Sequence, residues 1–303
     1  MDNQTTVTYF VFMGFSDSPT VQIFLFLIFL FMYAVTLLGN MVIITVIRKN
    51  DCLQSPMYFF LSHLSFSDIC FSSVTIPKLL VNFCTSQTIS YSGCIAQMFF
   101  ILMTGTSELF ILVAMAYDRY VAICKPLHYG QIMSKVFCRW LVGGAWTTGS
   151  IQALVNTLLL LRLVFCGPNI IRHFSCEQPS LLALSCTDVS LNTVTFFITC
   201  SMMVGFSFLI ILFSYVHIVS TVLKMQSAEA KKKTFSTCSA HLIVVFLFYL
   251  TGSFRYMRPN SASSAVLDEL FSIQYSISTP MLNPIIYSLK TREIQEAFKK
   301  LIG

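Results

Sequence analysis

The chain has 303 residues, of which 55% are hydrophobic and only 11% are charged. A soluble domain carries about 25% charged residues, and the mean hydropathy of this chain is +0.74. The composition therefore excludes an ordinary soluble protein and predicts an integral membrane protein. The net charge of +6 does not indicate a nucleic-acid partner. The Lys and Arg residues are divided among short loops, where they set the orientation of a membrane protein.

The first 20 residues are the predicted extracellular N-terminus, which begins with a polar stretch that contains the glycosylation sequon Asn3-Gln4-Thr5. A glycan on Asn3 would place this N-terminal segment outside the cell. The segment is followed by seven apolar runs, each long enough for a helix that crosses a bilayer, which needs about 20 residues. The runs cover roughly residues 21–47, 57–81, 93–120, 140–161, 193–223, 233–255 and 269–289. We therefore expect an all-α membrane protein with a seven-transmembrane helix bundle over residues 21–289.

Residues 290–303 form the predicted cytoplasmic tail. Apolar side chains recur there at helical spacing, with charged residues on the opposite face. The apolar positions are Ile294, Ala297, Phe298 and Leu301. This pattern predicts a short amphipathic helix that lies on the inner face of the membrane.

The positive charges test the predicted orientation. With the N-terminus outside, seven crossings place the C-terminus inside, and membrane proteins carry an excess of Lys and Arg on the inner side. The fourteen inner positions are Arg48, Lys49, Arg119, Lys125, Lys135, Arg139, Lys224, Lys231, Lys232, Lys233, Lys290, Arg292, Lys299 and Lys300. The five outer positions are Lys78, Arg162, Arg172, Arg255 and Arg258. The bias agrees with the glycosylation sequon and predicts a multi-pass plasma-membrane protein with an extracellular N-terminus.

The eleven cysteines are divided between the two sides of the membrane. Cys94, Cys166, Cys176 and Cys186 fall on the outer, oxidising side, where disulfides form. Four cysteines allow three sets of pairings, which spacing alone does not distinguish. No Cys/His cluster has the spacing of a metal site.

The most informative motif is MAYDRYVAICKPLHY at residues 115–129, where Asp118 and Arg119 stand side by side at the end of an apolar run. A charge inside hydrocarbon costs roughly 2.5–3.5 kcal/mol even on lenient insertion scales. The pair therefore needs partners or a task. One interpretation is an ion pair that works as a switch; the other is an Arg that merely extends toward the membrane surface.

Further motifs fall in the other spans, in chain order. They are Gly39-Asn40, PMYFFLSHLSFSD at 56–68, Ser214-Tyr215, FSTCSAHL at 235–242 and PMLNPIIYS at 280–288. With the 115–129 run, they show that the chain resembles an olfactory receptor of the rhodopsin-like (class A) G-protein-coupled receptor superfamily over essentially its whole length. One departure is Leu250, where the family usually has Gly after the preceding Tyr, and a Leu there could change the cavity floor or the flexibility of the helix.

The resemblance implies which residues anchor and switch the bundle. It pairs Cys94 with Cys176, and Cys166 with Cys186. From Cys94 to Arg119 a helix rises about 37 Å, so the third span links an outer anchor to an inner switch. The residues implied in switching and G-protein coupling are Asp118, Arg119, Tyr120, Tyr215, His241, Asn283, Pro284 and Tyr287. In the active state of this family the Arg turns toward the G protein and the two tyrosines Tyr215 and Tyr287 move near it.

The resemblance also implies a ligand site in the outer half of the bundle. Its residues are Ile101, Leu102, Gly105, Thr106, Thr199, Met202, Met203, Tyr249, Gly252, Tyr256, Ile273 and Ser276. This set is mostly apolar, and Ile101 stands where amine receptors have Asp. The expected ligand is a small, mostly apolar volatile odorant. The expected partner is a stimulatory heterotrimeric G protein on the cytoplasmic face, whose activation raises cyclic AMP. Arg255 near the rim could attract a carboxylate or simply end its helix.

Asp68 and Glu108 are two carboxylates deep within the spans. Such groups need protons, polar partners or a cation. The resemblance implies a sodium site at this pair that favours the inactive state, and no other cofactor. The alternatives are a polar cluster without an ion and acid/base catalysis.

Two other classes of protein remain as alternatives. A transporter or channel is disfavoured because no inverted repeat and no continuous polar pore face is visible. A membrane enzyme is disfavoured because no catalytic motif is present, so we expect the protein not to be an enzyme.

Overall fold

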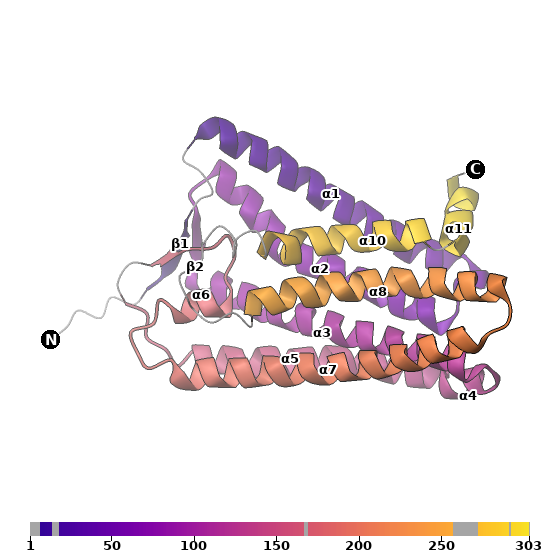
Figure 1. Ribbon diagram of the computed structural model, residues 1–303. Helices are drawn as coiled ribbons and strands as arrows, with labels where there is room; N and C mark the ends of the chain where they lie inside the picture. Colours follow the sequence, from indigo (N-terminus) through magenta and orange to yellow (C-terminus); the bar gives the residue numbers. More distant parts are fainter. Residues whose placement is uncertain (1–6, 14–17, 167–168, 257–271, 291, 303) are drawn as a thin grey trace.

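The structure is a computed structural model that describes residues 7–13, 18–166, 169–256, 272–290 and 292–302. Long helices run side by side along one direction, with the N-terminus at one end of the bundle and the C-terminus at the other (Figure 1). The long helices are α1 (Pro19–Lys49), α2 (Pro56–Cys84), α3 (Tyr91–Cys124), α5 (Lys135–Leu160), α7 (Ser190–Lys224) and α8 (Ala228–Tyr256). The next helical segment consists of the π-helical turn η3 (Gln274–Ser278) and α10 (Thr279–Lys290).

The helices begin where their sequences favour a helix start. Pro19 and Pro56 occupy the first turns of α1 and α2, where the backbone N–H that proline lacks would have no hydrogen-bond partner within the helix. The Ser90 side chain caps α3 by accepting a hydrogen bond from the Gly93 N–H at 3.1 Å. Ser134 caps α5 in the same way. Most helices extend a few residues beyond the predicted apolar runs, because their end turns include polar residues such as Arg48 and Lys49 of α1.

Short elements complete the chain. They are η1 (Asp51–Leu53), η2 (Pro126–His128), α4 (Tyr129–Ile132), α6 (Gln178–Leu182) and α11 (Arg292–Ile302), with the strands β1 (Tyr9–Phe12), β2 (Thr88–Ser90) and β3 (Ile170–Ile171). The strands and α6 lie at one end of the bundle, which we call the sheet end (Figure 1). The helices α4 and α11 lie at the opposite end, which we call the α11 end.

The sheet was not predicted from the sequence. Its order is β2-β1-β3, with β1 antiparallel to β2 and parallel to β3. Phe10 in β1 is fully buried, and its ring centroid lies 5.6 Å from that of Phe165, with the two ring planes nearly perpendicular. Three short strands from distant segments show no periodicity, so only the packing of the outer loops reveals them.

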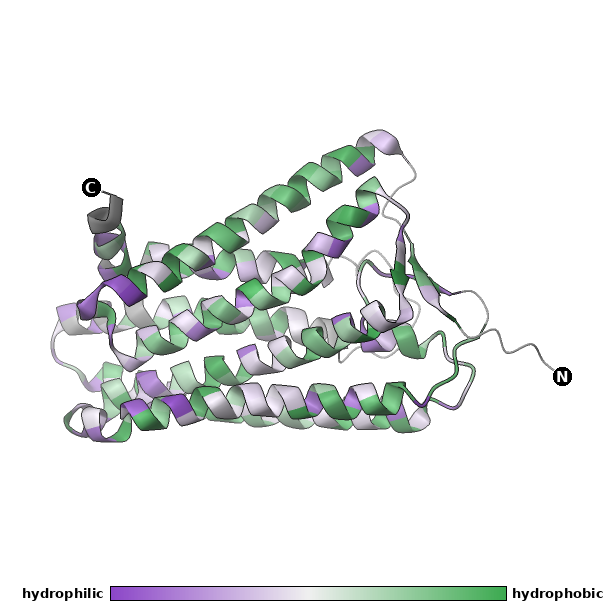
Figure 2. Cartoon of the chain, turned by 180° about the vertical axis from the view of Figure 1, so that it is seen from behind, coloured by the Kyte–Doolittle hydropathy of each residue, from purple (hydrophilic) through white to green (hydrophobic). Residues whose placement is uncertain are grey.

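Helix α3 forms the centre of the bundle. It packs against α2, α5 and α7 and is buried along most of its length. By contrast, α1 and α7 leave large apolar side chains exposed, among them Phe31 at 68% and Phe206 at 60%. Figure 2 shows hydrophobic residues along much of the length of α1. Such a surface is expected on helices that face lipid.

Four described helices, α1, α2, α3 and α7, are long and apolar enough to cross a membrane by their own composition. Helices α5 and α8 are as long as a span requires but more polar, and the apolar part of α8 is Cys238–Gly252. Their positions beside α3 in the bundle indicate that they also span the membrane, which their composition alone does not indicate (Figure 1).

Helix α11 turns away from α10 (Figure 1). Its Ile294 and Ala297 are buried in the same core as residues of α1, and Phe298 is 39% exposed. The predicted amphipathic helix is therefore present, and its apolar stripe packs partly on the bundle itself.

Candidate functional site

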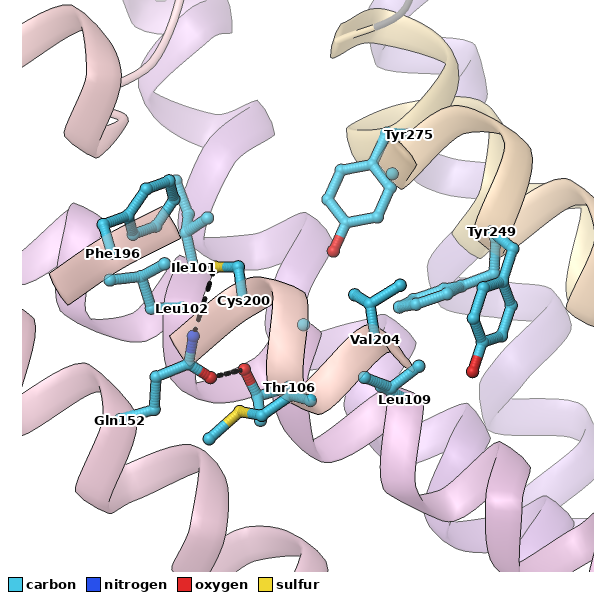
Figure 3. Close-up of a pocket in the computed structure, with 14 residues that line it drawn as sticks. Ile101, Leu102, Thr106, Leu109, Gln152, Phe196, Cys200, Val204, Tyr249 and Tyr275 are labelled. Atoms are coloured by element: carbon cyan, nitrogen blue, oxygen red, sulfur yellow. Dashed lines mark hydrogen bonds between the residues drawn. The ribbon is translucent and has the colours of Figure 1, made fainter. Parts of the chain in front are cut away.

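A cavity opens between α3, α5, α7, α8 and η3 toward the sheet end. It contains about 680 Å³ of space free of protein atoms, counting its opening. Its lining residues are Ile101, Leu102, Gly105, Thr106, Leu109, Gln152, Phe196, Cys200, Met203, Val204, Phe248, Tyr249, Gly252 and Tyr275 (Figure 3). The lining is mostly apolar, with a few hydrogen-bonding groups.

The cavity includes many of the residues predicted for ligand binding. Those on α3 are Ile101, Leu102, Gly105 and Thr106, and those on α7 and α8 are Met203, Tyr249 and Gly252. A Cβ atom at Gly105 would lie 2.6 Å from the Tyr275 hydroxyl oxygen. The glycine therefore leaves room that any other residue would fill.

Four of the predicted residues do not line this cavity. Met202 is 68% exposed on the outer surface of α7. The Thr199 hydroxyl donates to carbonyl oxygens of its own helix. On α7 the lining positions are Phe196, Cys200, Met203 and Val204, which recur at the spacing of one helix face. Thr199 and Met202 fall on neighbouring faces.

Ile273 and Ser276 also lie outside the lining, where Tyr275 stands instead. The π-helical turn of η3 adds a residue to the turn and rotates the side chains that follow. The assignment of Ile273 and Ser276 rested on the resemblance to the family, and the structure places Tyr275 in the lining instead. Tyr256 ends α8, but its side chain lies outside the described part of the chain.

Sequence reasoning missed several lining residues, of which Gln152 is the most informative. It lies inside the apolar run of α5 and is 5% exposed. The Thr106 hydroxyl donates to Gln152 Oε1 at 2.5 Å, and Gln152 Nε2 donates to Cys200 Sγ at 3.5 Å. A polar residue within an apolar span was the signal that could have pointed to it.

The loop over the cavity is fixed by two disulfides, and both predicted pairings are confirmed. Cys94 is joined to Cys176, with Cα atoms 5.4 Å apart, and Cys166 to Cys186, with Cα atoms 5.9 Å apart. The Cys176 N–H also donates to Gln97 Oε1 at 2.8 Å. The loop is thus held against the start of α3 by a covalent bond and a buried hydrogen bond.

At the α11 end, Asp118 holds Arg119. Arg119 Nε and Nη2 both donate to Asp118 Oδ2, at 3.0 and 2.5 Å. The Tyr129 hydroxyl of α4 donates to Asp118 Oδ1 at 2.7 Å. Burial, followed by the nearby Asp118 carboxylate, raises the pKa of Tyr129 above its ordinary value, so its hydroxyl keeps the proton that it donates. Tyr129 is a contact that the sequence motif contains but whose role was not predicted.

The predicted tyrosines of the switch do not hydrogen-bond to Arg119 among the described residues. His241 Nε2 lies 3.1 Å from the Leu112 carbonyl oxygen, which only accepts, so the Nε2–H donates to it. His241 Nδ1 therefore accepts from the Tyr215 hydroxyl at 2.7 Å. The buried Tyr287 hydroxyl has no hydrogen-bond partner in the described part of the chain. Arg119 is bound to Asp118 rather than to the tyrosines.

Tyr120 points away from this cluster, and its ring lies 5.9 Å from Phe213 of α7. Pro284 packs against α1, where a Cβ atom at Gly39 would lie 3.0 Å from Pro284 Cγ. Asn40 Nδ2 donates to the Pro280 carbonyl oxygen at 3.1 Å and joins the same two helices.

The two predicted carboxylates are both buried, Asp68 fully and Glu108 to 3% exposure. Asn283 Nδ2 donates to both Asp68 oxygens, at 3.1 and 3.0 Å. Glu108 Oε1 and Asn283 Oδ1 have no hydrogen-bond partner among the described residues. Buried oxygens without donors fit a hard cation such as Na⁺.

Asn3 and Arg258 lie outside the described residues, as does the side chain of Arg255. Within the described part of the chain, no group of three or more His, Cys, Asp or Glu residues is placed to hold a metal ion.

The fold defines the class of protein. The chain is similar to the crystal structure of squid rhodopsin, with a TM-score of 0.75 and 18% sequence identity, over 95% of this chain and 87% of the rhodopsin chain. At this identity the likeness shows the fold alone, which is the seven-helix bundle of rhodopsin.

Sequence similarity then identifies the family. The chain is 47% identical to Olfactory receptor 8S1 of Homo sapiens over 298 residues, which are 97% of this chain and 82% of that receptor. It is 47% identical to Olfactory receptor 1 of Rattus norvegicus over 300 residues, 99% of this chain and 96% of the relative. The sequence profile described as "Olfactory receptor" matches residues 29–303. The chain belongs to the olfactory receptor family.

Membership of this family decides between the classes left open by the sequence. The protein is a multi-pass plasma-membrane receptor that acts on a G protein in response to a small molecule, and it is not an enzyme. The transporter and membrane-enzyme alternatives are thereby set aside.

Proposed function

We propose that the chain binds a small, mostly apolar volatile odorant in the cavity of Figure 3 and activates a stimulatory G protein, which raises cyclic AMP. The observation that carries this proposal is the shared set of helices. Helix α3 carries Thr106 in the cavity and Arg119 at the α11 end, about 20 Å further along the helix. Helices α7 and α8 carry cavity residues and also Tyr215 and His241.

The proposed mechanism is a shift between two arrangements of these helices. In the structure, Arg119 is bound to Asp118, and Tyr215 is bound to His241. A ligand favours the active arrangement only if it binds that arrangement more tightly. An odorant that draws α7 and α8 toward α3 at the cavity would tilt their far ends and release Arg119 toward the G protein.

The proposed orientation places the sheet end outside the cell and the α11 end in the cytoplasm. The disulfides at the sheet end support it, because disulfides form in oxidising compartments. Basic residues at the other end, such as Lys125 and Lys231, would flank the G-protein groove and attract anionic lipid headgroups. Membrane lipid would cover the apolar outer faces of α1 and α7.

Gly105→Leu is expected to abolish the cyclic AMP response to odorants. The new side chain would enter the cavity, where even a Cβ atom lies 2.6 Å from the Tyr275 hydroxyl. The matched control is Gly144→Leu on α5, because a Cβ atom at Gly144 meets nothing within 4 Å. Cyclic AMP would be measured in transfected cells over an odorant panel. Surface expression would be measured with an antibody to an N-terminal tag on intact cells, which also tests the orientation.

Two results would contradict the proposal. An unchanged odorant response in Gly105→Leu would show that the ligand binds elsewhere. A receptor that reaches the surface and alters another second messenger, without any rise in cyclic AMP, would show that its G protein is not the stimulatory one.

We further propose that Na⁺ binds at Asp68 and Glu108 and favours the inactive arrangement. Asp68, Glu108 and the Asn283 amide oxygen are the residues that would hold it. Because a cation there would bridge α2, α3 and α10, it would oppose their relative movement.

Replacing extracellular sodium by choline is therefore expected to raise agonist-free cyclic AMP by about twofold or more, a shift of roughly 0.4 kcal/mol. Glu108→Gln should remove this dependence, because a neutral amide binds the cation less well. The control is Glu296→Gln on the exposed face of α11. If Glu108→Gln keeps the same sodium dependence as the control, the site is not at this pair.

A further inference from the structure

The polar groups of the cavity are not spread evenly over its wall. Thr106, Gln152 and Cys200 gather on one side, where α3, α5 and α7 meet (Figure 3). Two tyrosine hydroxyls lie elsewhere in the cavity. That of Tyr249 donates to Ser207 Oγ at 2.5 Å and points away from these three residues, and that of Tyr275 would lie 2.6 Å from a Cβ atom at Gly105. A ligand that forms a directional hydrogen bond with this cluster of three, which we call the polar corner, would therefore be fixed in orientation.

The hydrogen bonds in the polar corner leave the Gln152 amide as a donor. Its Oε1 accepts from the Thr106 hydroxyl at 2.5 Å, which turns Nε2 toward Cys200. Nε2 carries two hydrogens, and its partner here is a thiol sulfur at 3.5 Å, which is a weak acceptor. A ligand oxygen that accepts from Nε2 would replace a weak bond with an ordinary one.

The rest of the cavity restricts the charge of the ligand. None of the fourteen described lining residues carries a formal charge. A carboxylate held against these fourteen residues would have no cationic partner among them, which disfavours it. The remaining lining favours an apolar body.

We propose that Gln152 is the specificity-determining residue of the cavity and selects uncharged odorants with an apolar skeleton and one carbonyl oxygen, such as aldehydes, ketones and esters. The proposal rests on the proposed function and adds the ligand class. Gln152 donates the hydrogen bond to the carbonyl, and Thr106 acts as a positioning residue that holds the amide in the donating orientation.

The test uses carbonyl compounds, unbranched and cyclic, each paired with the hydrocarbon that lacks the oxygen and the carboxylate of equal carbon number. Cyclic AMP dose-response curves would be recorded for the full-length receptor in cells. For the wild type, we expect carbonyl compounds to act at concentrations about tenfold or more below those of the paired hydrocarbons, which is the worth of one hydrogen bond. The carboxylates should be inactive.

Gln152→Met keeps the length of the side chain and removes the amide donor. We expect it to raise the half-maximal concentration of carbonyl compounds by about tenfold while changing that of the hydrocarbons by less than about twofold. Thr106→Val should produce a smaller loss, about threefold, confined to the carbonyl compounds. The control is Thr147→Val on α5, whose hydroxyl donates only to its own helix.

The outcomes separate this inference from the proposed function. If a carbonyl compound keeps its potency in Gln152→Met at matched surface expression, or if only carboxylates or hydrocarbons activate the wild type, the assignment of Gln152 is overturned and the proposed function stands. If no compound of any class raises cyclic AMP in a receptor present at the surface, both are overturned.

Discussion

Replacing Arg119 by Ala is expected to abolish odorant-evoked cyclic AMP at normal surface expression. Arg119 is 15% exposed at the α11 end and forms two hydrogen bonds to Asp118. Its charge becomes available to the G protein once Asp118 releases it. Hydrogen bonds to charged groups contribute about 1.5–3 kcal/mol. The loss of the guanidinium from the G-protein contact should therefore lower the response by more than about tenfold.

The matched control for this prediction is Arg139→Ala. Arg139 lies near the same end, on the exposed surface of α5, and its replacement by Ala also removes one positive charge. Both variants would be compared at equal surface expression with an odorant that activates the wild type. A full response in Arg119→Ala would show that this arginine is only a helix-end residue extending toward the membrane surface.

The second large effect is expected from Cys94→Ser, which should deprive the receptor of a stable odorant site. The disulfide joins residues separated by 82 positions in the sequence. In the chain-entropy account a closure of this length stabilises the fold by roughly 4.5 kcal/mol. Without the disulfide, the loop over the cavity would lose the covalent anchor that lies beside the hydrogen bond from the Cys176 N–H to Gln97.

The measurement is the surface level of the tagged receptor, followed by its melting temperature after mild solubilisation. Cys166→Ser opens a separation of only 20 residues and should destabilise less. Cys70→Ser removes a free cysteine and serves as the control. If Cys94→Ser retains the wild-type melting temperature and odorant response, the disulfide does not hold the cavity together.

Much of the fold followed from local sequence. The apolar runs lie on the helices because backbone groups within a bilayer must bond internally, which limits a spanning segment to helix or barrel. The sheet at the opposite end from α11 escaped prediction, because β1, β2 and β3 contribute two to four residues each from distant parts of the chain. Strand pairing of this kind depends on contacts between loops and leaves no periodic signal.

The candidate site was predicted less completely than the fold. The α3 residues Gly105 and Thr106 line the cavity as expected, whereas Met202 faces outward and Tyr275 takes the place expected for Ser276. The π-helical turn at η3 changes the direction of side chains without changing the apolar character of the run. The resemblance to the family therefore located the segment but did not determine which of its side chains face inward.

The amino-acid sequence by itself predicted a membrane protein of helices with an Asp118-Arg119 pair at one helix end, and its resemblance to olfactory receptors implied a mostly apolar ligand site toward the other end. The helices and the position of the pair depend on residue type and spacing along each span. Only the tertiary structure decided that Gln152 turns its amide toward Cys200, that Tyr129 binds Asp118 and that Asn283 binds Asp68. Each of these contacts joins residues on different helices, and hydrogen bonds form only at short distances that the packing of the helices sets.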